Sequence, residues 1–237
     1  DWLINYQGGF IRRGLIGELL FQTHYLLSIN LDILVFCFVV FLYSILLILL
    51  IKSIKYLETS KIDTLIFLSP GFFLYPIMNS EVIGRKEILL YISLGLIVFF
   101  EKKIKNKYLI LITILSIFIL SLTHSGLLFY SPYLIFLYFL INLNRNKKIE
   151  LIEILIFIIS LLIIFFVIYF NQGSKTQVLE ICDSIKNFVK GDCINRGQFL
   201  WLYSSLSEHM NITLKFKTNF KDYFIIYFLS LIGVFLF

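Results

Sequence analysis

Long apolar blocks separated by short polar segments run along most of the chain. A helix needs about 20 apolar residues to cross the roughly 30 Å hydrocarbon core of a bilayer. Blocks of full or slightly reduced length occupy Leu31–Ile51, Thr64–Ser80, Ile88–Phe100, Tyr108–Leu122, Leu127–Ile141, Leu151–Phe170 and Tyr223–Phe237. The pattern predicts an all-α protein, a polytopic transmembrane helical bundle with six spans and a truncated seventh.

The polar segments divide this single integral membrane domain, residues 1–237, into parts. Residues 31–170 carry the six spans, and residues 223–237 form the truncated one. Residues 1–30 are expected to lie in the interface on the outer face, with a helix over Phe10–Ser28. Residues 171–222 are too long for a simple connection, which predicts an outer-face loop or cap. The chain opens on Asp1 and closes on Phe237 inside an apolar run, so we expect a fragment.

Composition agrees with a membrane protein. Of the 237 residues, 59% are hydrophobic and only 15% are charged, with a mean hydropathy of +0.90. Average soluble domains carry about a quarter charged residues, so this chain lies outside that class. The same composition excludes a disordered chain, a coiled coil and a disulfide scaffold. The formal net charge is +6. This charge reflects membrane orientation, as the loops below indicate, and nucleic acid is not an expected partner.

Basic residues concentrate in three short loops. Residues 52–63, 101–107 and 142–149 hold ten of the 21 Lys and Arg residues. Cytoplasmic loops of membrane proteins are enriched in Lys and Arg. These loops are alternate ones if every block crosses once, so charge and crossing pattern predict the same orientation. Residues 1–30, 80–87, 123–126 and 171–222 are then expected on the outer, periplasmic or extracellular, face.

The cysteines fit this orientation. Cys37 lies within a predicted span and is expected to be a small apolar residue. Cys182 and Cys193 both lie in the long outer-face segment, where oxidation is permitted, and we predict a disulfide between them. Two unpaired thiols are the alternative. A metal site is disfavoured, because only His209 supplies a nitrogen ligand in that segment.

The opening segment contains a candidate anion site. Arg12 and Arg13 follow Gly8-Gly9 and precede Gly14. The glycines free the backbone, so that amides and guanidinium groups can converge on an anion, and the arginine fork can bond two phosphate oxygens at once. Under the alternative interpretation, both arginines simply extend to lipid headgroups.

A second polar group, residues 81–87, contains Glu81, Arg85 and Lys86. The apolar block that follows has 13 residues, too few to cross at 1.5 Å per residue unless the span extends backward. Such an extension brings Arg85 and Lys86 to the bilayer edge, facing a polar cavity. The alternative is a short exposed loop above a locally thinned bilayer.

His124 lies in a third polar segment, residues 123–126, between two short apolar blocks. A turn between short helices lies below the membrane surface, where non-helical backbone is tolerated only if it is buried in protein or lines water. His124 can transfer protons or contact phosphate at this depth. A structural hydrogen-bonding histidine is the simpler alternative.

Together these groups predict a site at one membrane face for a lipid-linked sugar that enters laterally from the bilayer. The lipid-phosphate-binding candidates are Arg12, Arg13, Arg85 and Lys86, and the catalytic candidates are Asp1, Glu18, Glu81 and His124. A carboxylate would act as base on an acceptor hydroxyl. Fingerprints of nucleotide-binding and hydrolase enzymes do not occur. No cofactor is assigned, and a divalent cation is left open.

The opening run over residues 1–17, DWLINYQGGFIRRGLIG, resembles the first outer loop of multi-pass proteins from bacterial surface-polysaccharide loci. The layout resembles that of GT-C type glycosyltransferases. This resemblance implies an upstream span, a bacterial cytoplasmic membrane location, and Asp1 as the acceptor-activating carboxylate, with Glu18 or Glu81 as substitutes. It also implies a polyprenyl-phosphate-linked sugar donor and a glycan acceptor.

Three other functions are compatible with the sequence. An O-antigen polymerase-like protein also joins lipid-linked glycans on the outer face through loop arginines. A transporter or flippase is disfavoured, because such a protein is expected to carry ionisable groups deep in its spans. In a non-catalytic membrane scaffold, the outer-face charges would be unrelated to one another.

Overall fold

The computed structural model describes residues 2–56, 84–101, 103–188, 193–194 and 197–204. The described residues are helical and irregular, without β-strands, in agreement with the predicted all-α class. The predicted spans Thr64–Ser80 and Tyr223–Phe237 lie outside the described residues. So do the candidate site residues Asp1 and Glu81.

The helices of the described part follow the apolar blocks closely. They are α1 (Leu15–Leu27), α2 (Leu31–Tyr56), α5 (Ile88–Phe100), α6 (Asn106–Thr123), the 3₁₀ helix η1 (Ser125–Tyr130), α7 (Ser131–Asn144), α8 (Leu151–Phe170), α9 (Lys175–Ile185) and α10 (Gly197–Tyr203). Four stretches are long and apolar enough to cross a membrane: Leu31–Lys52, Asn106–Thr123, Ser125–Asn144 and Leu151–Phe170. They indicate a multi-pass membrane protein in contact with a lipid bilayer.

The remaining described block forms α5, which keeps its 13 predicted residues. At 1.5 Å per residue this helix is about 20 Å long, less than the hydrocarbon thickness. It does not extend backward as a helix, because the chain turns over residues 84–87 and Gly84 adopts a φ of 77°. Residues 84–87 therefore reach the end of the bundle at which α2 and α7 begin, and they do so as a turn, without lengthening α5.

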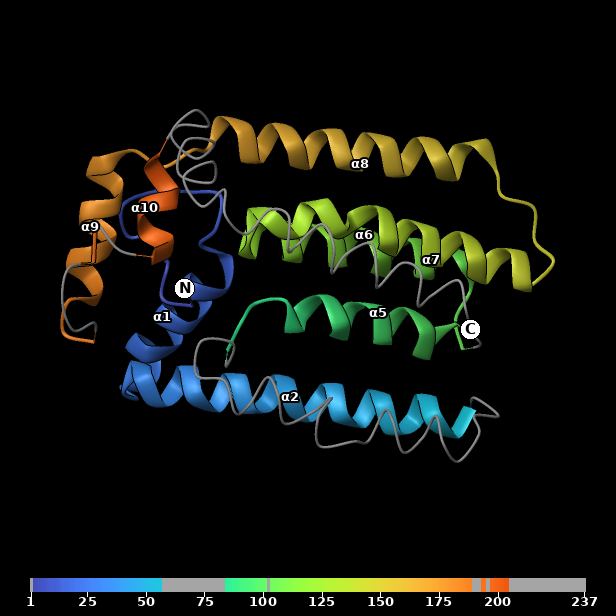
Figure 1. Ribbon diagram of the computed structural model, residues 1–237, viewed down its shortest axis with the longest axis horizontal. Coiled ribbons are helices and arrows are strands. Elements are labelled where there is room, and N and C mark those ends of the chain that lie inside the picture. The colour runs from blue at the N-terminus through green and yellow to red at the C-terminus, as the bar shows by residue number, and fades with distance from the viewer. Residues whose placement is uncertain (1, 57–83, 102, 189–192, 195–196, 205–237) are drawn as a thin grey trace, which may run out of the picture.

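The long helices lie side by side, and α1, α9 and α10 gather at one end of them (Figure 1). Helices α2, α5 and α7 run away from that end, whereas α6 and α8 run toward it. Residues 84–87, 123–126 and 171–174 therefore emerge at one end, and residues 103–105 and 145–150 at the other. This arrangement brings three of the polar segments singled out in the sequence to the same end.

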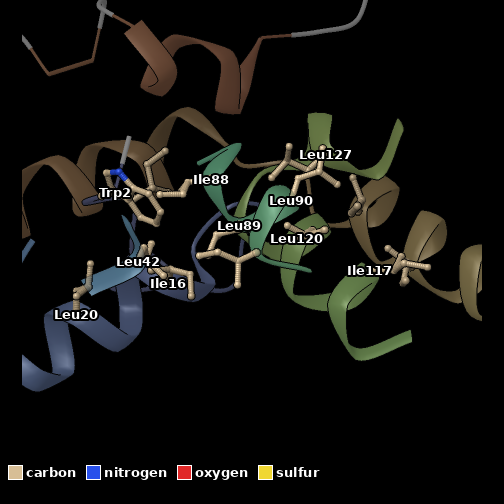
Figure 2. Close-up of a cluster of buried hydrophobic side chains, with 14 of the residues drawn as sticks. Trp2, Ile16, Leu20, Leu42, Ile88, Leu89, Leu90, Ile117, Leu120 and Leu127 are labelled. Atoms are coloured by element: carbon tan, nitrogen blue, oxygen red, sulfur yellow. The ribbon is translucent and has the colours of Figure 1, made fainter. Parts of the chain in front are cut away.

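A core of apolar side chains joins this end to the bundle. Side chains from the opening segment, α1, α2, α5, α6 and η1 gather in one buried cluster (Figure 2), including Trp2, Ile16, Leu20, Leu42, Ile88, Leu89, Leu90, Ile117, Leu120 and Leu127. The outward faces of α2 and α8 instead expose large apolar residues such as Phe36, Phe41, Phe166 and Phe170. Exposed apolar faces on helices of spanning length suit contact with lipid.

The predicted helix over Phe10–Ser28 is shorter in the structure and begins at Leu15. The backbone N–H of Arg12 donates to the Asn171 carbonyl at 3.1 Å, a bond between distant segments that replaces helical pairing. Residues 2–14 form a loop folded onto α1. A Cβ at Gly17 would lie 1.8 Å from the Ile4 carbonyl oxygen, so this close approach requires glycine.

The segment after α8 packs against the same opening loop. Helix α9 begins at a capping box formed by Ser174 and Gln177. The Asn5 side-chain amide donates to the Ser184 hydroxyl at 2.9 Å. A Cβ at Gly8 would meet the Gln177 backbone. The described part of the predicted loop or cap is therefore largely helical and covers residues 2–14.

Candidate functional site

Two basic side chains from distant parts of the chain are buried at the end of the bundle where α1 lies. Arg13 comes from the opening loop and is 8% exposed, and Lys86 comes from the turn before α5 and is 1% exposed. Both reach the same short segment, residues 123–125, where α6 ends and η1 begins. The Arg13 Nε–H donates to the Ser125 hydroxyl at 3.0 Å, and the Lys86 ammonium donates to the Thr123 carbonyl at 2.8 Å.

We refer to this arrangement as the basic site. Its members are Arg12, Arg13, Lys86, Thr123, His124 and Ser125. Three chain segments supply them, so only the folded bundle brings them together. The two phosphate-binding segments predicted from sequence thus meet the predicted histidine segment.

The end of α6 explains where the lysine lies. Thr123 is the last residue of α6, and its carbonyl belongs to the last turn, where carbonyl groups lack helical partners. A cation at this position satisfies the carbonyl and is favoured by the negative end of the helix dipole. Lys86 is therefore held by a structural feature that the α6 sequence creates.

His124 organises the turn beside the two cations. Its backbone is extended, with φ −153° and ψ 110°, which stops α6. Its Nδ1 accepts a hydrogen bond of 3.2 Å from the Gly126 N–H and so caps η1. Since Nδ1 accepts, Nε2 carries the proton in the neutral ring. The structural role weighed for this histidine is present, and its ring is partly exposed beside Ser125.

Trp2 supports the site from the other side. Its indole N–H donates to the Gly84 carbonyl, and the Lys86 ammonium lies 5.7 Å from its ring centroid. Phe38 of α2 meets the same indole edge-on at 5.6 Å between centroids. The aromatic face favours the lysine charge by a cation–π interaction. Trp2 thereby links the start of the described chain to the turn before α5.

Burial makes the positive charges of the basic site costly. Burial and the neighbouring Arg13 lower the pKa of Lys86 to about 7, and Glu87 only partly opposes this shift. Burial and the charge of Arg12 lower the pKa of Arg13 to about 10, and burial also lowers the pKa of Arg12. Desolvation disfavours a charged form, and nearby like charges add to the effect. A bound anion would reverse both effects.

The other predicted site residues lie apart from this arrangement. Arg85 is exposed at the turn, next to buried Lys86. Glu18 holds the opening loop on α1, since its carboxylate accepts hydrogen bonds from the Tyr6 N–H at 2.8 Å and the Gln22 amide at 2.6 Å. Glu18 thus has a structural role in the described part of the chain.

Cys182 and Cys193 form a disulfide, with their Cα atoms 5.9 Å apart. The bond ties the middle of α9 to the chain that leads to α10. Cys37 is a free cysteine on α2 and is exposed. The disulfide lies in the segment that packs over the opening loop, so it belongs to the surroundings of the basic site.

Sequence reasoning overlooked three partners of the basic site. Thr123 and Ser125 lie in the polar segment 123–126 and Trp2 in the interfacial segment 1–30, but the sequence does not single them out. The signal that could have identified Ser125 is its place in a turn between two short apolar blocks. Among the described residues no group of three or more His, Cys, Asp or Glu side chains is placed to hold a metal ion.

Comparisons with known proteins identify no relative of this chain. No protein-family model matches the chain, and no curated protein or solved structure is significantly similar to it.

Proposed function

We propose that this chain belongs to a membrane glycosyltransferase-like protein of cell-surface polysaccharide synthesis. It uses a polyprenyl-phosphate-linked sugar on the outer face of a bacterial cytoplasmic membrane, and the basic site binds the phosphate of that donor. The observation that carries the proposal is the burial of Arg13 and Lys86 against one segment, residues 123–125.

A phosphate suits this site for electrostatic reasons. Burying a cation is costly because it loses its hydration, and a neighbouring cation increases the cost. A phosphate group would neutralise them, and charge-assisted hydrogen bonds to phosphate are among the strongest in proteins. Arg13 would supply its planar fork and Lys86 a compact point charge.

The surroundings suit a lipid-borne phosphate better than a soluble one. Helix α1 exposes apolar side chains at the same end of the bundle, including Leu19, Tyr25, Leu26 and Leu27. An isoprenoid chain could remain in the bilayer along this face while the phosphate occupies the basic site. This is the arrangement expected for a donor that enters laterally.

In the proposed reaction, an acceptor hydroxyl oxygen attacks the anomeric carbon of the sugar. The bond between that carbon and the phosphate oxygen breaks, and polyprenyl phosphate leaves with the electron pair. Arg12, Arg13 and Lys86 stabilise the charge on the leaving phosphate. A carboxylate takes the acceptor proton, and Asp1, the covalent neighbour of Trp2, is the proposed base. Glu81 and Glu18 are the substitutes, and His124, as a member of the basic site, is the proposed proton relay.

The binding step can be tested with the full-length protein in nanodiscs, titrated with polyprenyl phosphate. We expect Arg13→Ala and Lys86→Met to weaken binding about tenfold or more, because each removes a charge-assisted contact. Lys105→Met removes an exposed charge at the other end of the bundle and should leave affinity unchanged. Equal affinity in all four proteins would refute the phosphate site.

The reaction class needs a separate assay. Proteoliposomes are supplied with a radiolabelled polyprenyl-phosphate sugar and a lipid-linked glycan. Addition of one sugar to the acceptor supports a transferase, and joining of whole glycan blocks supports the polymerase alternative. Movement of the label across the membrane without bond breakage supports a transporter. In cells, Asp1→Asn and Arg13→Ala should abolish surface glycan at unchanged protein level, and normal glycan in both would refute catalysis.

A further inference from the structure

A second group of buried polar side chains lies at the other end of the bundle. Asn106 begins α6, Tyr138 and Asn142 lie one turn apart on α7, and Glu153 lies in the first turn of α8. Tyr138 and Asn142 are fully buried, and Glu153 is 8% exposed. We refer to these four residues as the polar cluster. It shares no residue with the basic site and plays no part in the proposed reaction.

The hydrogen bonds of the polar cluster leave several buried polar atoms without a partner in the described part of the chain, a carboxylate oxygen among them. The Asn106 amide donates to the Tyr138 hydroxyl at 2.8 Å and to Glu153 Oε1 at 2.7 Å. In the described part of the chain, Glu153 Oε2, Asn106 Oδ1 and both amide atoms of Asn142 are buried without a hydrogen-bond partner. Three side-chain oxygens thus lack donors in a region where unsatisfied polar atoms are costly.

The helix ends do not account for this arrangement. Glu153 lies in the first turn of α8, where the helix dipole favours a negative charge. The dipole supplies no donor to Oε2, however, and it offers nothing to the amide of Asn142 on another helix. Ionisable groups at membrane depth mostly have a partner and a function. The buried carboxylate of Glu153 therefore calls for a positively charged partner.

The geometry points to a bound monovalent metal cation, which we propose is held by oxygen atoms of Glu153, Asn142, Asn106 and Tyr138. Hard cations in proteins are bound by carboxylate, amide and other oxygen ligands of this kind. The cluster contains one carboxylate, so a monovalent ion leaves the site neutral, whereas a divalent ion would leave a buried net positive charge. Such an ion would join α6, α7 and α8 at this end of the bundle.

The test measures thermal unfolding of the purified full-length protein in NaCl and in choline chloride at equal ionic strength. A ligand that binds only the folded state raises Tm, by about 5 °C or more for a chain of this size at saturation. We expect this rise with Na⁺, used as the probe, and no rise with choline, whose methyl groups keep its charge away from oxygen ligands. A rise with Ca²⁺ and none with Na⁺ would overturn the monovalent assignment.

Two substitutions and a matched control locate the effect. Glu153→Gln and, as a second variant should the first fail to fold, Asn142→Leu are each expected to abolish the Na⁺-dependent rise. Glu150→Gln removes the same charge from an exposed residue that precedes α8, and should keep the rise. Equal Tm values for the wild type in both salts would indicate that water alone fills the cluster. A Na⁺ effect that persists in Glu153→Gln would place the ion elsewhere; either result overturns the proposal.

Discussion

The ammonium group of Lys86 donates a 2.8 Å hydrogen bond to the carbonyl of Thr123, the last residue of α6. This bond joins the turn before α5 to the end of α6. It satisfies the ammonium group of a lysine that is buried, with only 1% of its surface exposed. It also directs the lysine toward the segment that Arg13 reaches from the opening loop. The position of this one amino group links the fold to the proposed phosphate chemistry.

Lys86 should make stability depend on pH. Burial first, and then Arg13, lower the pKa of Lys86 in the folded state to about 7, from 10.5. Between these values the unfolded chain binds more protons, so the free energy of unfolding should increase as the pH rises from about 7 to about 10.5. Thermal unfolding of the wild type and Lys86→Met across this range measures the effect as their difference. A difference independent of pH would contradict the depressed pKa.

Gly17 should be required for docking of the opening loop. Gly17→Ala places a methyl group 1.8 Å from the Ile4 carbonyl oxygen, a backbone atom that cannot move alone. We expect a loss of about 1–3 kcal/mol in stability, measured as a lower Tm, together with weaker polyprenyl phosphate binding. Gly95→Ala is the matched control, since its methyl group meets only the flexible Leu49 side chain, at 3.2 Å. Equal losses in both variants would contradict the close approach.

The disulfide should stabilise the segment that covers the opening loop. A cross-link between Cys182 and Cys193 closes a short loop with a sequence separation of 11. Loops of about this length lose roughly 2–3 kcal/mol of stability when the bond is removed. The double variant Cys182→Ser/Cys193→Ser should unfold at a lower temperature than the wild type and no longer respond to reductant. Cys37→Ser, which removes the free cysteine, should retain the wild-type response.

The two ends of the bundle should face different compartments. Single cysteines replacing Lys103 or Lys105, in a chain lacking Cys37, should be labelled in intact cells only by a membrane-permeant reagent. A cysteine replacing Lys175, at the start of α9, should also react with an impermeant reagent. Labelling in the opposite sense would reverse the predicted orientation. It would also place the basic site in the cytoplasm.

The helices were largely predictable from the chain. Ile88–Phe100 and Leu151–Phe170 have the same bounds in the sequence pattern and in the structure, and α2 begins at the predicted Leu31. The bounds of such a helix follow from local sequence. The free energy of moving each apolar side chain out of water depends mainly on that side chain, so a run of apolar residues bounded by polar ones marks the helix. The predicted start of the first helix, Phe10, was wrong. Helix α1 begins at Leu15, because the backbone N–H of Arg12 bonds to the distant Asn171 instead of joining the helix.

The candidate site was predictable only as separate parts. The sequence indicated Arg12, Arg13, Lys86 and His124 as candidates, but treated Arg85 and Lys86 alike. In the structure Lys86 is buried and Arg85 is exposed. The turn at Gly84 and the Thr123 carbonyl decide this difference, and the carbonyl lies 37 residues away in sequence. The polar cluster around Glu153 was not anticipated, because three helices must pack before its oxygens lose access to water.

The sequence by itself determined that the chain is helical, that its helices suit a membrane, and that its chemically distinctive residues fall in a few polar segments. These properties follow from the composition of short stretches, which sets the cost of hydrating each stretch. Only the tertiary structure decided which charges are buried together. The free energy of a buried cation depends on the groups that surround it, and at the basic site those groups come from three separate segments of the chain.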